Sequence, residues 1–144
     1  MADAEAFHRR LTAAFLSSAY AGRRRLAIAI VGAGATEVEL STELLEGHAA
    51  LSEALDPSQR FDLRVVLVEA APRILGGLRE EVAEKAARAL RDRGVELITD
   101  VRVMHVLSEG LETIQGSYLR IWWSGPPASR RERPTKGSAW RQDG

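Results

Sequence analysis

The sequence contains no cysteine, so it can form no disulfide framework, no thiolate metal site and no redox dithiol. It also lacks any apolar run near the ~20 residues that a transmembrane helix requires. The first residues, MADAEAFHRRL, place acidic side chains ahead of basic ones and include no apolar stretch, which is unlike a secretory signal. We therefore expect a cytoplasmic protein without a transmembrane segment.

An excess of charge of one sign is missing as well. The chain has 20 basic and 20 acidic residues, so electrostatics gives no reason to expect nucleic acid as a partner. The basic cluster RRER near the C-terminus is interpreted as a charge run. His8, His48 and His105 have no metal-ligand spacing, and we predict no metal site. Each histidine is interpreted as a surface or internally hydrogen-bonded side chain.

The 144 residues, 45% of them hydrophobic and 28% charged, are enough for about one globular domain. Hydrophobic periodicity predicts helices over residues 4–20, 35–55 and 78–94, and strands over residues 26–31, 63–70, 95–99 and 101–113, the last containing a turn. The alternation implies an α/β fold: a Rossmann-like βαβαβ parallel sheet with an N-terminal helix and a β-hairpin extension.

The character of the sequence changes near residue 115, where periodicity of either kind stops. We predict an N-terminal amphipathic helix and linker (1–24), a Rossmann-like domain (25–114) and an irregular tail (115–144).

A glycine motif follows the first predicted strand, in the stretch AIVGAGATEVEL. Gly32, Gly34 and Glu37 occupy the three positions of G-x-G-x-x-G between a strand and a helix, the context in which this motif binds a dinucleotide. The first glycine permits a tight turn, and the second lets the backbone approach a pyrophosphate at the helix N-terminus. We predict that the cofactor contacts here are Gly32, Ala33, Gly34, Ala35, Thr36 and Glu37.

A carboxylate ends the second predicted strand. Glu69 follows Gly34 by 35 residues, more than the usual ~20, and the helix and a loop over residues 56–62 absorb the difference. A carboxylate there accepts hydrogen bonds from the adenosine ribose and repels a 2′-phosphate, which favours NAD(H). Ala70 and Arg73 complete the predicted contacts, and Arg73 keeps NADP(H) as a lesser alternative.

Glu37 stands where the motif has its third glycine, which normally lets the helix lie close to the strand. Its side chain must be pushed aside or must force the helix outward. Its charge suits a helix N-terminus but repels a pyrophosphate. The hypothesis is that cofactor affinity is reduced while the fold is kept.

Four segments together resemble the NAD(H)-binding domain of type II NADH dehydrogenases, in the FAD-dependent pyridine nucleotide-disulfide oxidoreductase superfamily. They are FHRRLTAAF, IVGAGATEVEL, VVLVEAAPRIL and LREEVAEKAARALRDRGVELITDVRV, and the likeness covers about residues 5–112. The resemblance implies that NADH passes a hydride to FAD in a separate domain and that electrons continue to a quinone. It implies pyrophosphate contacts at Gly32 and Gly34, a ribose ligand at Glu69, and peripheral association of the full-length enzyme with the inner membrane.

The resemblance also assigns Glu39 a place near the nicotinamide–flavin contact. A first-turn helix acid is an equally good interpretation of Glu39, and both stay open.

The sequence departs from this family in three ways. No FAD domain precedes residue 5, so we expect NAD(H) binding without bound FAD and without independent catalysis, and an FAD domain as a missing partner. The third glycine is absent. The expected strand ending in Trp-Ala-Ala-Gly is replaced by LRIWWSGPPAS.

A frameshift near residues 113–118 is our hypothesis for the third departure. With G/C-ending codons, a shifted frame beginning in the Leu119 codon permits Ala-Asp-Leu-Val-Val-Trp-Ala-Ala-Gly. Two alternatives to an NADH dehydrogenase fragment remain. One is a non-catalytic nucleotide-binding or interaction module, and the other is an inert pseudogene product.

Overall fold

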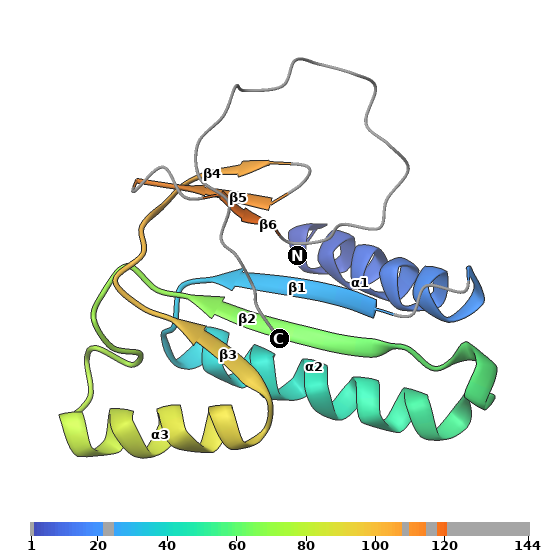
Figure 1. Cartoon of the computed structure of the whole chain (residues 1–144), viewed down its shortest axis with the longest axis horizontal. Helices are drawn as coiled ribbons and strands as arrows, with labels where there is room; N and C mark the ends of the chain where they lie inside the picture. The colour runs from blue at the N-terminus through green and yellow to red at the C-terminus, as the bar shows by residue number, and fades with distance from the viewer. Residues whose placement is uncertain (1, 22–24, 108–109, 115–117, 121–144) are drawn as a thin grey trace, which may run out of the picture.

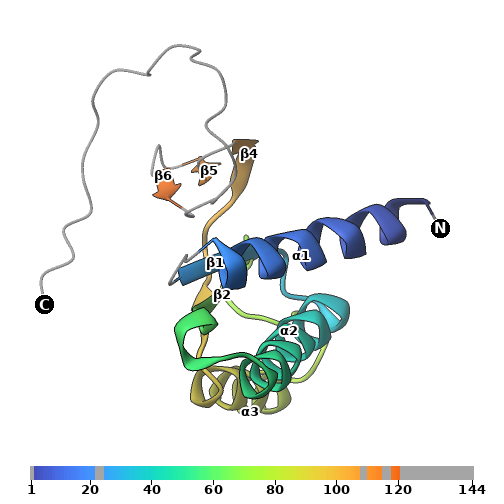
Figure 2. The ribbon, with the colours of Figure 1, turned by 90° about the vertical axis from the view of Figure 1, so that its right-hand side faces the viewer.

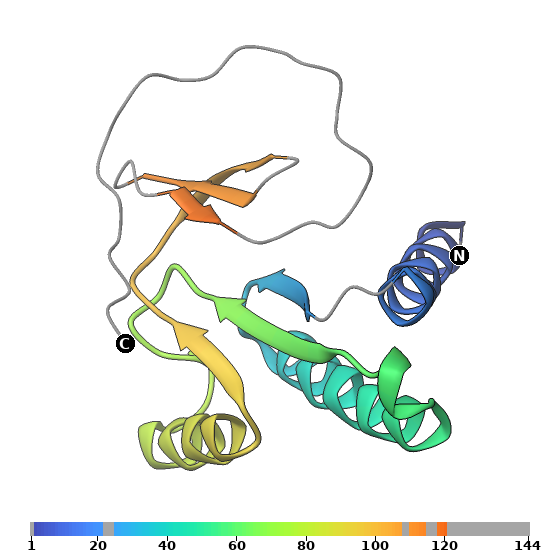
Figure 3. The ribbon, with the colours of Figure 1, turned by 45° about the vertical axis from the view of Figure 1, so that its right-hand side comes forward.

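A computed structural model of the chain describes residues 2–21, 25–107, 110–114 and 118–120. It confirms the predicted α/β fold. A parallel sheet (sheet A: β1, β2 and β3) has two helices on one side and a small antiparallel sheet (sheet B: β4, β5 and β6) on the other (Figures 1 and 3).

Sheet A is formed by three parallel strands in the order β1-β2-β3, which are β1 (Arg25–Val31), β2 (Asp62–Val68) and β3 (Val95–Ile98). Helix α2 (Ala35–Ala54) and the short 3-10 helix η1 (Pro57–Gln59) connect β1 to β2, and α3 (Glu80–Asp92) connects β2 to β3. Both α-helices pack on the same face of the sheet because right-handed crossovers place consecutive helices there. Because the three strands are parallel, their carboxyl ends lie at one common edge of the sheet.

Strand β2 is the centre of the core. Its residues Val65, Val66, Leu67 and Val68 are each at most 1% exposed. Val65 and Leu67 pack with Leu44 of α2 and Leu90 of α3, among others, whereas Val66 and Val68 face the opposite side. A strand buried on both faces needs a continuous apolar run, which explains why LRVVLV lacks polar alternation.

Sheet B packs against part of the other face of sheet A. Its strands are β4 (Val103–Leu107), β5 (Gly110–Thr113) and β6 (Tyr118–Arg120). Leu111 is 3% exposed and packs against Val66 and Val68. The predicted β-hairpin extension is thus present. Within the segment predicted as irregular, Tyr118–Arg120 pairs with β5 as a strand. Residues 115–117 and 121–144 lie outside the described part of the chain. The structure does not test the frameshift hypothesis.

Helix α1 (Ala2–Tyr20) lies beside β1 and runs past the end of the sheet (Figure 2). Leu11, Ala14 and Phe15 pack against the core, as the amphipathic pattern predicts. Phe7 and Tyr20, which share that pattern, are 48% and 70% exposed. The N-terminal part of α1 extends away from the sheet, which leaves Phe7 with little to pack against (Figure 2). The C-terminal end is packed, since Ser18 and Ala19 are 1% and 3% exposed, and Tyr20 lies outside this packed face.

Candidate functional site

The turn after β1 has the conformation that its first glycine requires. Gly32 has φ +108°, a region that residues with a Cβ rarely adopt, and its N–H donates to the Val68 carbonyl at 2.8 Å. Gly34 is different: it is the N-cap of α2, with φ −76° and ψ −174°, which any residue can adopt. The backbone conformation therefore does not require glycine at position 34. Because Gly34 has no Cβ, it leaves room for another group directly above the loop.

Glu69 joins the end of β2 to the glycine loop (residues 32–34). Its Oε2 accepts the Ala33 N–H and its Oε1 accepts the Ala71 N–H, both at 2.8 Å. The Glu69 carboxylate thus lies against the glycine loop at the carboxyl ends of the strands, the edge at which open α/β sheets bind their ligands. The assignment of Gly32, Gly34 and Glu69 as cofactor contacts stays a prediction.

Two further loops complete this edge of sheet A, and the sequence analysis missed both. The Leu75 N–H donates to the Ala33 carbonyl at 2.8 Å, and the Asp100 N–H donates to the Ala71 carbonyl at 3.1 Å. Leu75 and Asp100 have φ +51° and +60°. Aspartate tolerates this region better than most residues, which is a weak sequence signal for Asp100, but nothing in the sequence marks Leu75.

Glu37 is half-buried in the first turn of α2, and its side chain folds back over the glycine loop. Its Oε2 lies 2.9 Å from the position that a Cβ on Gly34 would take, and its Cγ lies 3.5 Å from the corresponding position on Gly32. Among the described residues beyond the neighbours in the chain, no other atom comes within 4 Å of the Gly34 position. The space left open by Gly34 is therefore occupied by a carboxylate.

The other predicted contacts follow either the glycine loop or Glu69 in the chain. Ala35, Thr36 and Ala70 are exposed. Glu39 is exposed one half-turn beyond Glu37, so the structure leaves both interpretations of it open. Arg73 is half-buried and its Nη2 donates to the Gly76 carbonyl at 3.1 Å.

Arg73 also lines an open groove of about 880 Å³ between α3 and β3. Three arginines and three acids share this groove: Arg73, Arg88, Arg91, Glu80, Glu84 and Asp92. The two signs balance, so the groove has no excess positive charge for a 2′-phosphate.

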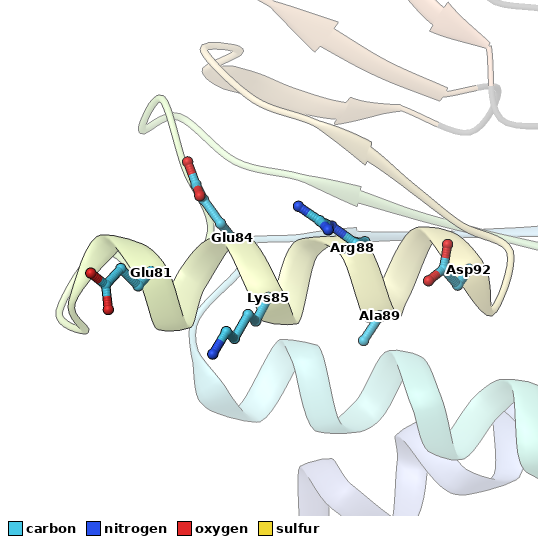
Figure 4. Close-up of a pocket in the computed structure, with 6 residues that line it drawn as sticks. All are labelled: Glu81, Glu84, Lys85, Arg88, Ala89 and Asp92. Atoms are coloured by element: carbon cyan, nitrogen blue, oxygen red, sulfur yellow. The ribbon is translucent and has the colours of Figure 1, made fainter.

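A second depression of about 490 Å³ lies along α3 (Figure 4). Glu84 and Arg88 point to one side of the helix and Lys85 to the other, so the side chains do not converge on a common point. All six lining residues are exposed: Glu81, Glu84, Lys85, Arg88, Ala89 and Asp92. We interpret this depression as a solvated helix face.

The histidines do not come together in the part of the chain that the structure describes, and no group of three metal-ligating side chains forms there. His48 Nε2 is 2.7 Å from the Phe61 carbonyl oxygen, and the ring packs between Phe15 and Phe61. His48 is therefore an internally hydrogen-bonded side chain, whereas His8 and His105 are exposed.

Comparison with known proteins agrees with this geometry. A family model for pyridine nucleotide-disulphide oxidoreductases matches residues 1–121. The chain is 31% identical over 117 residues to the type II NADH:quinone oxidoreductase Ndh of Mycobacterium tuberculosis, a match covering 75% of this chain and 25% of that protein. It is 33% identical over 109 residues to the type II NADH:quinone oxidoreductase of Haemophilus influenzae, covering 71% and 24% respectively.

Among solved structures, the fold is similar to that of NDH2 from Plasmodium falciparum in complex with NADH. The TM-score is 0.54 at 17% identity, over 60% of this chain and 17% of that one. The chain spans about a quarter of the length of the curated relatives that it matches.

Proposed function

This chain belongs to the pyridine nucleotide-disulphide oxidoreductase family, and we propose that it is the NAD(H)-binding domain of a flavin-dependent NADH:quinone oxidoreductase. The observation that carries the proposal is the hydrogen bond between the glycine loop and Glu69 at the carboxyl ends of β1 and β2. The names of these two curated relatives support the electron donor and acceptor.

The residues that would hold NADH have separable roles. The loop at Gly32 and Gly34 brings the backbone close to the diphosphate, and the N-terminus of α2 supplies N–H groups and a partial positive charge. Glu69 accepts one backbone N–H at each oxygen, and each oxygen keeps a lone pair for a ribose hydroxyl. A carboxylate at this place favours NAD(H) over NADP(H), since it would repel a 2′-phosphate.

NADH, when bound, would supply a hydride to a flavin, and this chain would contribute the binding and orientation of NADH. In this chain Glu39 is proposed to lie on the nicotinamide side of the crevice. Residues outside this chain are proposed to supply the FAD domain, so we assign no catalytic activity to the chain alone.

Location follows from the same proposal. No helix among the described residues is long and apolar enough to cross a membrane. We propose that the whole enzyme acts at the cytoplasmic side of the inner membrane through peripheral association.

A calorimetric titration with NADH tests the function, with glycine variants as probes. Gly34→Ala places a methyl group above the loop without backbone strain, and the Glu37 Oε2, 2.9 Å from that position, must shift to admit it. Gly47→Ala is the control because an added Cβ there meets nothing within 4 Å. We expect saturable NADH binding to the unaltered chain and to Gly47→Ala, and binding about tenfold weaker in Gly34→Ala. Equal affinities for all three proteins, or no saturable binding, would contradict the proposal.

A further inference from the structure

We propose that the Glu37 carboxylate is an internal occupant of the diphosphate position, which weakens the binding of a dinucleotide and leaves the binding of a phosphate-free nucleoside unchanged. The inference rests on the proposed function, because it concerns the same site, formed by the glycine loop and Glu69. It adds a ligand class and an autoinhibitory contact to that function.

The first argument is positional. In this motif the second glycine is bare so that a pyrophosphate can approach the backbone. The atom nearest to the missing Cβ of Gly34 is Glu37 Oε2, at 2.9 Å. The carbons of the same side chain lie over Gly32, with Cγ and Cδ 3.5 and 3.6 Å from its missing Cβ. The side chain therefore covers both glycines, and a phosphate group cannot share that space with it.

The second argument is chemical. Gly34 is the N-cap of helix α2, whose first turn presents backbone N–H groups and the positive end of the helix dipole. A carboxylate in the first turn is attracted by the same groups that attract a phosphate. Glu37 is also the third helical residue, the position from which a glutamate side chain reaches back to the N-cap. The Glu37 carboxylate, which is part of the chain and always nearby, thus competes with the ligand's diphosphate for the N-terminus of α2.

The third argument concerns what Glu37 leaves accessible. Glu69 lies at the end of the neighbouring strand and contacts Ala33 and Ala71. No Glu69 atom lies within 4 Å of the position that a Cβ on Gly34 would take, where the Glu37 carboxylate lies. A nucleoside without phosphate can use Glu69 while Glu37 stays in place. A dinucleotide must first displace the glutamate and then bind close to its negative charge.

Calorimetric titrations with NADH and with adenosine test this on three variants. Glu37→Ala removes the bulk and the charge and keeps a good helix former, while Glu37→Gln removes only the charge. Glu43→Gln is the control, since it removes one exposed negative charge from the same helix, six residues after Glu37. Circular dichroism confirms that each variant is folded.

We expect NADH to bind about ten- to a hundredfold more tightly to Glu37→Ala than to the unaltered chain, with Glu37→Gln between them and Glu43→Gln unchanged. Adenosine affinity should be the same in all four proteins. Raising the salt concentration should narrow the gap between Glu37→Gln and the unaltered chain, because the charge term is screened.

Two results would overturn the inference by itself: NADH affinities equal within about twofold in the unaltered chain and Glu37→Ala, or adenosine affinity rising in parallel with NADH affinity. Absence of NADH binding to every variant would overturn the proposed function and this inference together.

Discussion

Replacing Glu69 by alanine should destabilise the whole domain, independently of any ligand. The carboxylate makes two hydrogen bonds of 2.8 Å to backbone N–H groups, one in the glycine loop at Ala33 and one at Ala71. The two N–H groups belong to different loops, so Glu69 connects the end of β1 to the end of β2. Alanine would leave both donors without their acceptor.

The expected magnitude follows from these two contacts. A hydrogen bond to a charged group contributes about 1.5–3 kcal/mol, and the half-buried position of Glu69 places each bond at the low end of that range. Glu69→Ala should therefore lower the free energy of unfolding by about 3 kcal/mol. Glu69→Gln keeps one acceptor oxygen but turns an NH₂ group toward the other donor, so it should cost about half as much.

Urea unfolding followed by circular dichroism measures the effect. With a slope of about 1.5 kcal/mol per molar urea, the midpoint of Glu69→Ala should fall by about 2 M. Glu96→Ala is the matched control, because Glu96 is paired with Arg64 at 2.6 Å on the surface of the same sheet. Exposed ion pairs contribute about 0.2–1 kcal/mol. A Glu69→Ala midpoint shift no larger than that of Glu96→Ala would refute the reasoning.

The remaining predictions concern backbone conformation and sheet packing. Gly32→Ala should lower the free energy of unfolding by about 1–2 kcal/mol, because an alanine is strained at φ +108°. Gly34→Ala, at φ −76°, should change the free energy of unfolding by less than about 0.5 kcal/mol. Equal changes for the two variants in urea unfolding would show that a side chain at position 32 causes no backbone strain. Leu111→Ala should cost about 2–4 kcal/mol because Leu111 fills the interface between the two sheets, and Met104→Ala, at a residue 52% exposed, should be near neutral. Thermal unfolding of this pair checks whether sheet B is part of the cooperative unit, and two similar melting temperatures would contradict it.

The sequence anticipated most of the fold because the relevant signals are local. The apolar run of β2 and the helical period of α3 each extend over one element, and the order of elements restricts the topology to a few choices. The predictions failed for two residues of α1 that do not reach the core and for a strand that depends on pairing with another strand. Phe7 and Tyr20 share the apolar pattern of α1 yet are exposed, and β6 forms because Leu119 pairs with Leu111.

By itself the sequence determined that a glycine turn would follow a buried strand and that an acid would end the next one. Only the tertiary structure decided what those groups contact. The parallel register that pairs Val31 with Val68 brings Glu69 to Ala33, and the backbone at Gly34 leaves a space into which the Glu37 side chain folds. Contacts between residues far apart in the chain, and the side-chain conformations that fill the resulting space, depend on packing, which no local pattern encodes.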